Sequence, residues 1–102
     1  MCPINYAVNK LGGKWKPLIL HRIQVGIYDF DSLHKAIPTI SKQVLQNQLR
    51  ELEFDGLIER DILSDHGVKL AYLLTDLGET IIPIIDKLSE WGAYRMRQLA
   101  LN

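Results

Sequence analysis

The chain has 102 residues, of which 47% are apolar and 24% charged, and its formal net charge is zero. This length allows one domain over residues 1–102, and the composition is that of a folded protein rather than a disordered one. No apolar run approaches the roughly 18 residues of a membrane span, no signal peptide is visible behind Met1, and the single cysteine excludes an intrachain disulfide. We therefore expect a cytoplasmic protein without membrane association. We also expect a binding module rather than an enzyme, because so short a chain offers few walls for a catalytic pocket.

The zero net charge conceals an asymmetry along the chain. Residues 1–50 carry seven Lys and Arg against two acidic residues, whereas residues 51–102 carry five against ten. Such a split is typical of a chain whose first half binds a polyanion, but charges on solvated surfaces also cluster by chance. Charge alone does not separate these two interpretations.

Glycine, proline and capping residues divide the first half of the chain into four expected helices. The Gly12-Gly13 pair ends the first helix, Asp31 or Ser32 is expected to cap the third, and Ser41 is a favourable N-cap for the fourth. The helices are predicted at about 3–11, 14–25, 32–37 and 42–55, with a short extended piece at 28–30.

The second half predicts a β-hairpin followed by one long helix. Two β-prone runs, 57–63 and 68–74, flank the polar loop Ser64-Asp65-His66-Gly67. Thr75 is a good N-cap for a final helix over about 76–99, which Pro83 should kink. Two short helices joined by a tight turn and followed by a hairpin predict a winged helix-turn-helix, an α+β fold that is mainly α.

The fourth expected helix carries the most informative surface pattern. At 100° per residue, Leu45, Leu49 and Leu52 share one stripe that should pack inward. Gln and Asn side chains can bond adenine edges in the major groove, and Arg can bond guanine edges. A plain solvated face usually includes Glu, so a polar surface without acids favours DNA recognition. Such a surface, here called the polar arc, consists of Lys42, Gln43, Gln46, Asn47 and Arg50.

Further polar residues around this helix and on the hairpin are candidate DNA contacts. His66 and Lys69 lie on or beside the hairpin tip, from which they could reach phosphates or the minor groove. Asp65 argues against deep insertion, and loop residues of this kind are often only solvated. The full predicted set is Lys14, Lys35, Thr39, Ser41, Lys42, Gln43, Gln46, Asn47, Arg50, His66 and Lys69.

The last helix carries more apolar surface than one small domain needs. From Leu77 to Trp91, apolar residues recur at the 4-3-4-3 spacing of a coiled-coil seam, and a second stripe from Ile82 to Leu99 lies beside it. One stripe can cover the core while the other needs a partner, although burial of both within one chain is the competing interpretation. At this size we favour a homodimer, which also supplies two reading helices for a palindromic site. The predicted interface residues are Ile4, Ile81, Ile84, Ile85, Leu88, Trp91, Met96 and Leu99.

Short motifs run through nearly the whole chain. They are Cys2-Pro3, Gly12-Gly13-Lys14-Trp15, Ile40-Ser41, Gln48-Leu-Arg-Glu-Leu52, Asp55-Gly-Leu-Ile-Glu-Arg60, Tyr72 and Leu74-Thr75-Asp-Leu-Gly78. As a set they resemble the HxlR family of bacterial winged-helix transcriptional regulators, relatives of the MarR type. The resemblance implies a homodimer with N- and C-terminal dimerisation helices, whose helix from Ser41 enters the major groove of a double-stranded, palindromic DNA operator. The wing departs from a common family pattern, because Ser64-Asp65-His66-Gly67 replaces prolines near the tip and Lys69 stands near the usual Arg.

Cys2 is a candidate redox residue. It stands at the start of the first expected helix, where the partial positive charge favours the reactive thiolate. Some HxlR-type regulators, which the chain resembles, use an N-terminal cysteine to sense quinones, aldehydes or oxidants, so the partner would be a small electrophile or oxidant. An exposed N-terminal cysteine without a function is the alternative interpretation.

Other chemistry is not indicated. The three histidines fit no metal-ligand spacing, and no phosphate-binding loop or nucleophile motif is present, so we expect no metal, cofactor or enzymatic activity. His34 is expected to be solvated. Two alternatives to DNA binding stay open: a protein-interaction adaptor on this scaffold, and a small-ligand-binding module or small enzyme with an apolar pocket at the dimer seam. The acid-free polar arc disfavours the adaptor, and the lack of a paired acid and base disfavours the enzyme.

Overall fold

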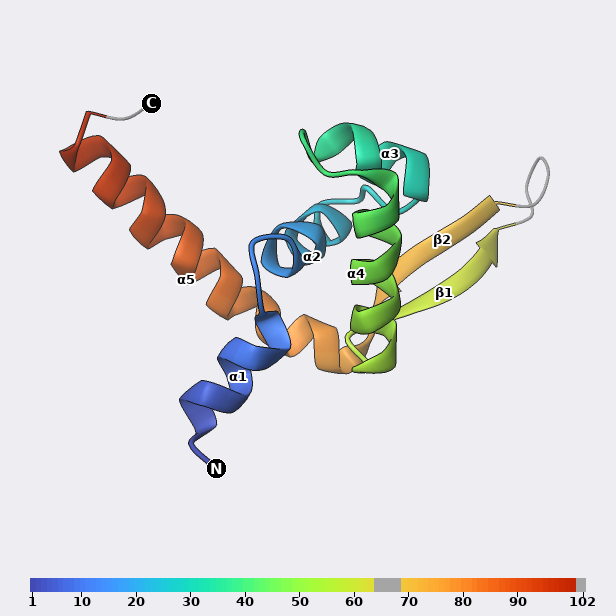
Figure 1. Cartoon of the computed structure of the whole chain (residues 1–102), viewed down its shortest axis with the longest axis horizontal. Helices are drawn as coiled ribbons and strands as arrows, with labels where there is room; N and C mark the ends of the chain where they lie inside the picture. The colour runs from blue at the N-terminus through green and yellow to red at the C-terminus, as the bar shows by residue number, and fades with distance from the viewer. Residues whose placement is uncertain (64–68, 101–102) are drawn as a thin grey trace.

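The computed structural model describes residues 1–63 and 69–100, without the side chain of Lys69. The elements are α1 (Pro3–Leu11), α2 (Lys16–Gln24), α3 (Phe30–Ala36), α4 (Lys42–Phe54), β1 (Ile58–Leu63), β2 (Lys69–Leu74) and α5 (Asp76–Gln98). Each element begins and ends within two residues of the predicted bounds. Helices α2, α3 and α4 form a body, from which α1 and most of α5 extend on one side and the hairpin of β1 and β2 extends on the other (Figure 1).

A core of leucine and isoleucine side chains joins α2, α3 and α4. The predicted inward stripe of α4 is confirmed, since Leu45, Leu49 and Leu52 are buried in this core, and Ile58 of β1 and Ile82 of α5 complete it. Each fully buried side chain of this kind stabilises the fold by about 1.5–3 kcal/mol. The largest fully buried side chains are Ile19, Leu20, Leu33, Ile37, Leu45, Leu49, Leu52 and Ile58.

The hairpin is an antiparallel pair whose register sets Ile58 opposite Leu74. At the other edge of β2, the backbone N–H of Tyr72 donates to the carbonyl of Tyr28 at 2.7 Å. The predicted extended piece at 28–30 therefore contributes a backbone hydrogen bond to the hairpin but is not a strand.

The start of α3 differs from the prediction. Asp29 is its N-cap, because one carboxylate oxygen accepts from the backbone N–H of Ser32 at 2.9 Å and the other from the Ser32 hydroxyl at 2.8 Å. The prediction that Asp31 or Ser32 caps this helix is therefore wrong. Asp31 instead lies in the first turn, where a negative charge interacts favourably with the helix dipole.

The first turn of α5 packs tightly against the junction between α4 and β1. Thr75 caps α5 by accepting from the backbone N–H of Gly78 at 3.0 Å, and its hydroxyl donates to the carbonyl of Gly56. A Cβ atom added at Gly78 would lie 2.1 Å from the carbonyl oxygen of Leu57, so only glycine fits there. The helix continues through Pro83 to Gln98.

Candidate nucleic-acid interface

The turn between α3 and α4 is fixed by local hydrogen bonds. His34 Nε2 donates to the carbonyl of Ile40 at 3.0 Å, so this half-buried histidine ties α3 to the turn and the expectation of a solvated side chain is wrong. Ser41 is the predicted N-cap of α4, since its hydroxyl oxygen accepts from the backbone N–H of Val44 at 3.1 Å. Thr39 has φ 72°, a left-handed conformation that costs a β-branched residue about 1–3 kcal/mol. Such a strained turn persists only because the surrounding packing enforces it.

The polar arc lies on the exposed face of α4, opposite the buried leucines. All five of its side chains are exposed. Gln43 Nε2 donates to Asn47 Oδ1 at 3.1 Å, which aligns two amides one helical turn apart. Each amide keeps further donor and acceptor capacity, as contacts to base edges require.

The other predicted DNA contacts are distributed unevenly. Lys35 is exposed on α3, and Thr39 and Ser41 are exposed in the turn that leads into α4. Thr39 and Ser41 therefore lie at the N-terminal end of α4, which carries the polar arc, while Lys35 belongs to the preceding helix. The predictions for His66 and for the Lys69 side chain lie outside the described residues.

Lys14 lies in a different environment. Its ammonium group is 4.5 Å from the centre of the Trp15 ring, a cation–π contact. It also lines a cleft between α2 and α5 whose other walls include His21 and Leu88. The structure therefore does not group Lys14 with the polar arc, because the residues that share its cleft come from α2 and α5.

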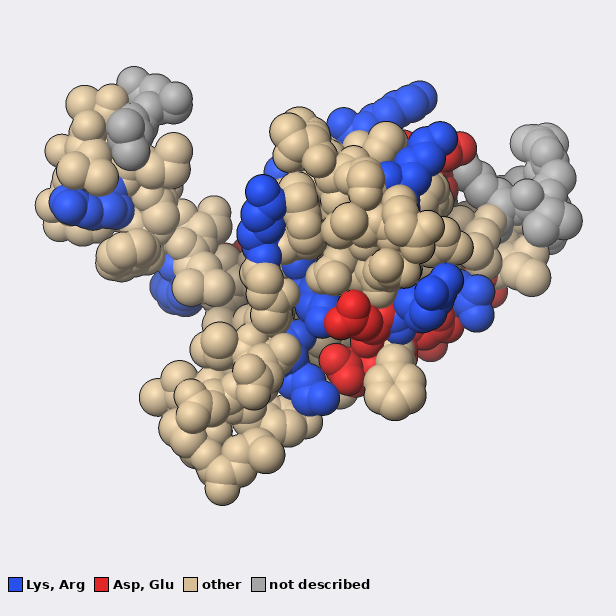
Figure 2. Space-filling model, in the orientation of Figure 1, with Lys and Arg blue, Asp and Glu red and all other residues tan. Residues whose placement is uncertain are grey.

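Three acidic residues at the C-terminal end of α4 each form an ion pair with a different element. This pairing offsets the negative charges of the three acids, and it holds the end of α4 against its neighbours. Figure 2 shows acidic side chains at the lower end of this face with Lys and Arg side chains beside them. The local sequence pattern of α4 gives no sign of the partners of these acids. The pairs are Lys16–Glu51 with α2 (3.0 Å), Lys10–Asp55 with α1 (3.3 Å) and Arg60–Glu53 with β1 (3.0 Å).

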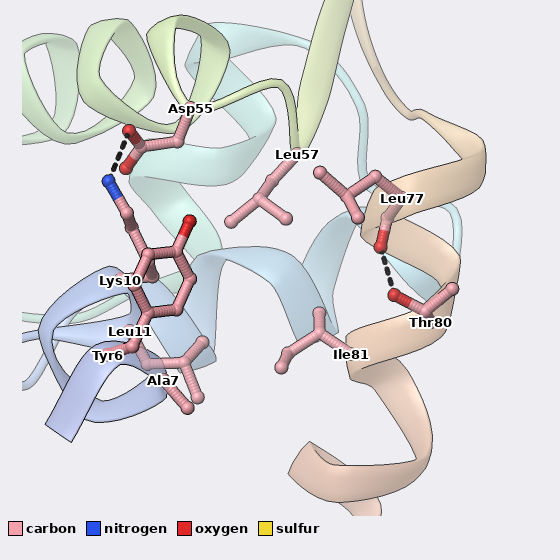
Figure 3. Close-up of a pocket in the computed structure, with 9 residues that line it drawn as sticks. All are labelled: Tyr6, Ala7, Lys10, Leu11, Asp55, Leu57, Leu77, Thr80 and Ile81. Carbon is pink, nitrogen blue, oxygen red and sulfur yellow. Dashed lines mark hydrogen bonds and ion pairs between the residues drawn. The ribbon is translucent and has the colours of Figure 1, made fainter. Parts of the chain in front are cut away.

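A pocket lies where α1, α5 and the α4–β1 junction meet (Figure 3). Its volume is about 230 Å³, and its walls are mainly apolar, with the Lys10–Asp55 ion pair at one side. Small-molecule sites usually have volumes of about 300–1,000 Å³. This pocket lies below that range, whereas the cleft between α2 and α5, with a volume of about 480 Å³, lies within it.

Apolar side chains are exposed along α1 and α5. Ile4 on α1 and Trp91 on α5 have exposed fractions of 72% and 66%. Ile85 is 5% exposed and belongs to the core, so the prediction that it lies at an interface is wrong, and Ile81 is half-buried against the core. The remaining predicted interface residues are exposed: Ile84, Leu88, Met96 and Leu99.

Cys2 is the N-cap residue of α1, and its side chain is exposed. Within residues 1–63 and 69–100, no three His, Cys, Asp or Glu side chains lie close enough together to hold a metal ion. The described helices include none long and apolar enough to cross a membrane.

Two helices joined by a tight turn, the second with an exposed acid-free face and followed by a β-hairpin, define a winged helix-turn-helix protein. Residues 10–100 match the family model described as HxlR-like helix-turn-helix, and the chain belongs to this family. The predicted family and the predicted α+β, mainly α fold class are thus confirmed, and the chain is a helix-turn-helix transcriptional regulator.

Similar proteins agree with this assignment. The chain is 41% identical over 92 residues to an uncharacterized HTH-type transcriptional regulator of Methanothermobacter thermautotrophicus, a match that covers 90% of this chain and 70% of the relative. It is 34% identical over 93 residues to the HTH-type transcriptional regulator YodB of Bacillus subtilis, covering 90% and 83%. Among solved structures, the redox regulator HypR in its reduced form superposes with a TM-score of 0.87 at 32% identity, covering 97% of this chain and 98% of that one.

Proposed function

We propose that the chain is a sequence-specific DNA-binding regulator whose helix α4 reads bases in the major groove of double-stranded DNA. The observation that carries this proposal is the polar arc, which is fully exposed, free of acids and held by three buried leucines on the opposite face of the helix. Amide and guanidinium groups in this arrangement match the donor and acceptor patterns of adenine and guanine edges. Exposed Lys42, in the first turn of this helix, and exposed Lys35, on α3, would contact phosphates and set the register of the helix.

The proposed active form is a homodimer. Ile84, Leu88 and Trp91 on α5 and Ile4 on α1 expose apolar surface that the single chain does not cover. A two-fold dimer would present two copies of α4 as recognition helices, which would fit half-sites one DNA turn apart, about 34–36 Å. The operator is therefore proposed to be palindromic. A regulator of this kind acts where the DNA is, so the proposed location is the cytoplasm.

Cys2 is proposed to make the regulator responsive to an oxidant or electrophile. Its thiol is exposed at the N-cap of α1, a helix that carries part of the proposed interface, so its modification could rotate one reading helix relative to the other. The chain holds one cysteine, so the reversible products are an adduct, a mixed disulfide, or a disulfide between two Cys2 residues. In the last case two thiols lose two electrons and two protons to an oxidant such as diamide. HypR is named a redox regulator and YodB has a diamide-treated structure, which supports the proposal by similarity.

Two experiments test these proposals. Selection of bound sequences from random DNA at a fixed salt concentration should enrich an inverted repeat with half-sites about one turn apart. Failure to enrich any sequence would contradict the proposal and favour the protein-interaction adaptor. For Cys2, diamide or a quinone should lower the DNA affinity of the wild type but not of Cys2→Ser; equal responses in the two proteins would leave Cys2 without a sensing role.

A further inference from the structure

A small notch lies between α4 and the hairpin. Its volume is about 120 Å³, and polar side chains make up most of its wall, in contrast to the pocket of Figure 3. Two of its residues, Gln46 and Arg50, belong to the polar arc, so the notch opens beside the surface proposed to read bases. We call it the Arg60 notch, and its lining residues are Gln46, Leu49, Arg50, Glu53, Arg60 and Tyr72.

Arg60 is oriented by one of its own neighbours. Its Nε donates to Glu53 Oε2 at 3.0 Å, while the side chain is 54% exposed. Because the guanidinium is planar, a fixed Nε–H also fixes the directions of the four N–H groups on its two terminal nitrogens. These four groups have no hydrogen-bond partner within residues 1–63 and 69–100. A planar fork with free terminal donors suits bidentate binding of a phosphate.

The charge of the notch also suits an anion. Two arginines, Arg50 and Arg60, and one glutamate, Glu53, line the notch, which leaves one net positive charge. Burial raises the pKa of the Tyr72 phenol, an effect that nearby Arg60 opposes and Glu53 reinforces. The Tyr72 hydroxyl therefore keeps its proton at neutral pH and is a possible donor.

We propose that the Arg60 notch binds one phosphate group of the DNA backbone through Arg60, while Arg50 stays on the base-reading polar arc and adds positive charge beside the notch. This inference rests on the proposed DNA-binding function and adds a contact from β1 that the sequence did not indicate. Phosphate contacts fix the orientation of a protein on the duplex without reading its sequence. A contact at the base of the hairpin would set how the hairpin and α4 sit together on the DNA.

The competing explanation is that Arg60 only neutralises Glu53, and a double-mutant cycle separates the two. Dissociation constants and their salt dependence would be measured for the selected operator and for a scrambled duplex. Arg60→Ala should weaken binding to both duplexes by about tenfold and reduce the salt slope by about one. Glu53→Gln alone should bind at least as tightly as wild type. If Arg60 contacts phosphate, the double variant Glu53→Gln with Arg60→Ala should bind both duplexes about tenfold more weakly than Glu53→Gln alone.

Several outcomes would overturn the proposal. If Arg60 only neutralised Glu53, the double variant would regain wild-type DNA affinity. If Arg60→Ala bound DNA as tightly as wild type, the phosphate site at the notch would be refuted while the proposed DNA-binding function would stand. Absence of DNA binding by the wild type would overturn both. Lys87→Ala is the charge-matched control on α5 and should bind within twofold of wild type. Thermal unfolding would confirm that each variant is folded, and Arg60→Lys, which keeps the charge but loses the fork, provides a second variant that should bind with intermediate affinity.

Discussion

Replacing Trp91 by alanine should dissociate the proposed dimer. An aromatic side chain buries about 150–250 Å². Trp91 is 66% exposed in the single chain, so roughly 130 Å² of its surface is available for a partner to cover. At about 25 cal/mol per Å², this corresponds to about 3 kcal/mol for each protomer. At about 1.4 kcal/mol for each factor of ten, the loss in one protomer alone raises the dissociation constant by about 100-fold, and because a two-fold dimer carries the change twice, the total rise should reach about 10⁴-fold.

Sedimentation equilibrium over a range of protein concentrations measures this constant directly. Ile62→Ala is the matched control, because Ile62 is 63% exposed but lies on β1, away from α1 and α5. This control should dimerise like the wild type. The reasoning is refuted if Trp91→Ala dimerises as tightly as the control, or if the wild type itself is a stable monomer at micromolar concentration.

Three further variants test how the fold holds α4. Glu51→Ala leaves the nearly buried ammonium of Lys16 without its partner and should reduce the free energy of unfolding by about 1–3 kcal/mol. This is less than for a fully buried pair, because the Glu51 side chain is 57% exposed. A reduction below about 0.5 kcal/mol in urea titrations would contradict the prediction. Gly78→Ala should cost at least about 2 kcal/mol, since the added Cβ meets the carbonyl of Leu57, and wild-type thermal stability would refute the close packing. Ser41→Ala removes the N-cap hydrogen bond and should cost about 1 kcal/mol, whereas Ser41→Gly should cost less; the reverse order would argue against capping.

Much of the fold follows from local signals in the sequence. The caps Ser41 and Thr75 and the leucine stripe of α4 depend on residues within a few positions of one another, and the structure confirms them. The cap of α3 does not follow from local signals in the same way. The sequence predicts Asp31 or Ser32, whereas Asp29 is the cap. Asp29 directly follows Tyr28, whose carbonyl accepts a backbone hydrogen bond from Tyr72 of β2, so the position of this backbone depends on a contact distant in the chain.

Features that depend on contacts distant in the chain could not be predicted. The Lys16–Glu51 pair joins residues 35 positions apart, and nothing in the local pattern of α4 selects this lysine as the partner. Similarly, the two apolar stripes of α5 are equivalent on a helical projection. The structure places Ile85 in the core and leaves Ile84 exposed, because the start of α5 is fixed by its packing against Leu57.

The central claim is that the polar arc of α4 reads DNA sequence. The most direct test compares binding of the selected operator and a scrambled duplex by the wild type and by a triple variant, Gln43→Ala, Gln46→Ala and Asn47→Ala. Loss of base contacts at about 1–3 kcal/mol each should bring the two dissociation constants of the triple variant close together. Lys42→Ala, the control for a phosphate contact, should weaken both duplexes equally and flatten the salt dependence. A folded triple variant that discriminates between the duplexes as well as the wild type would contradict the claim.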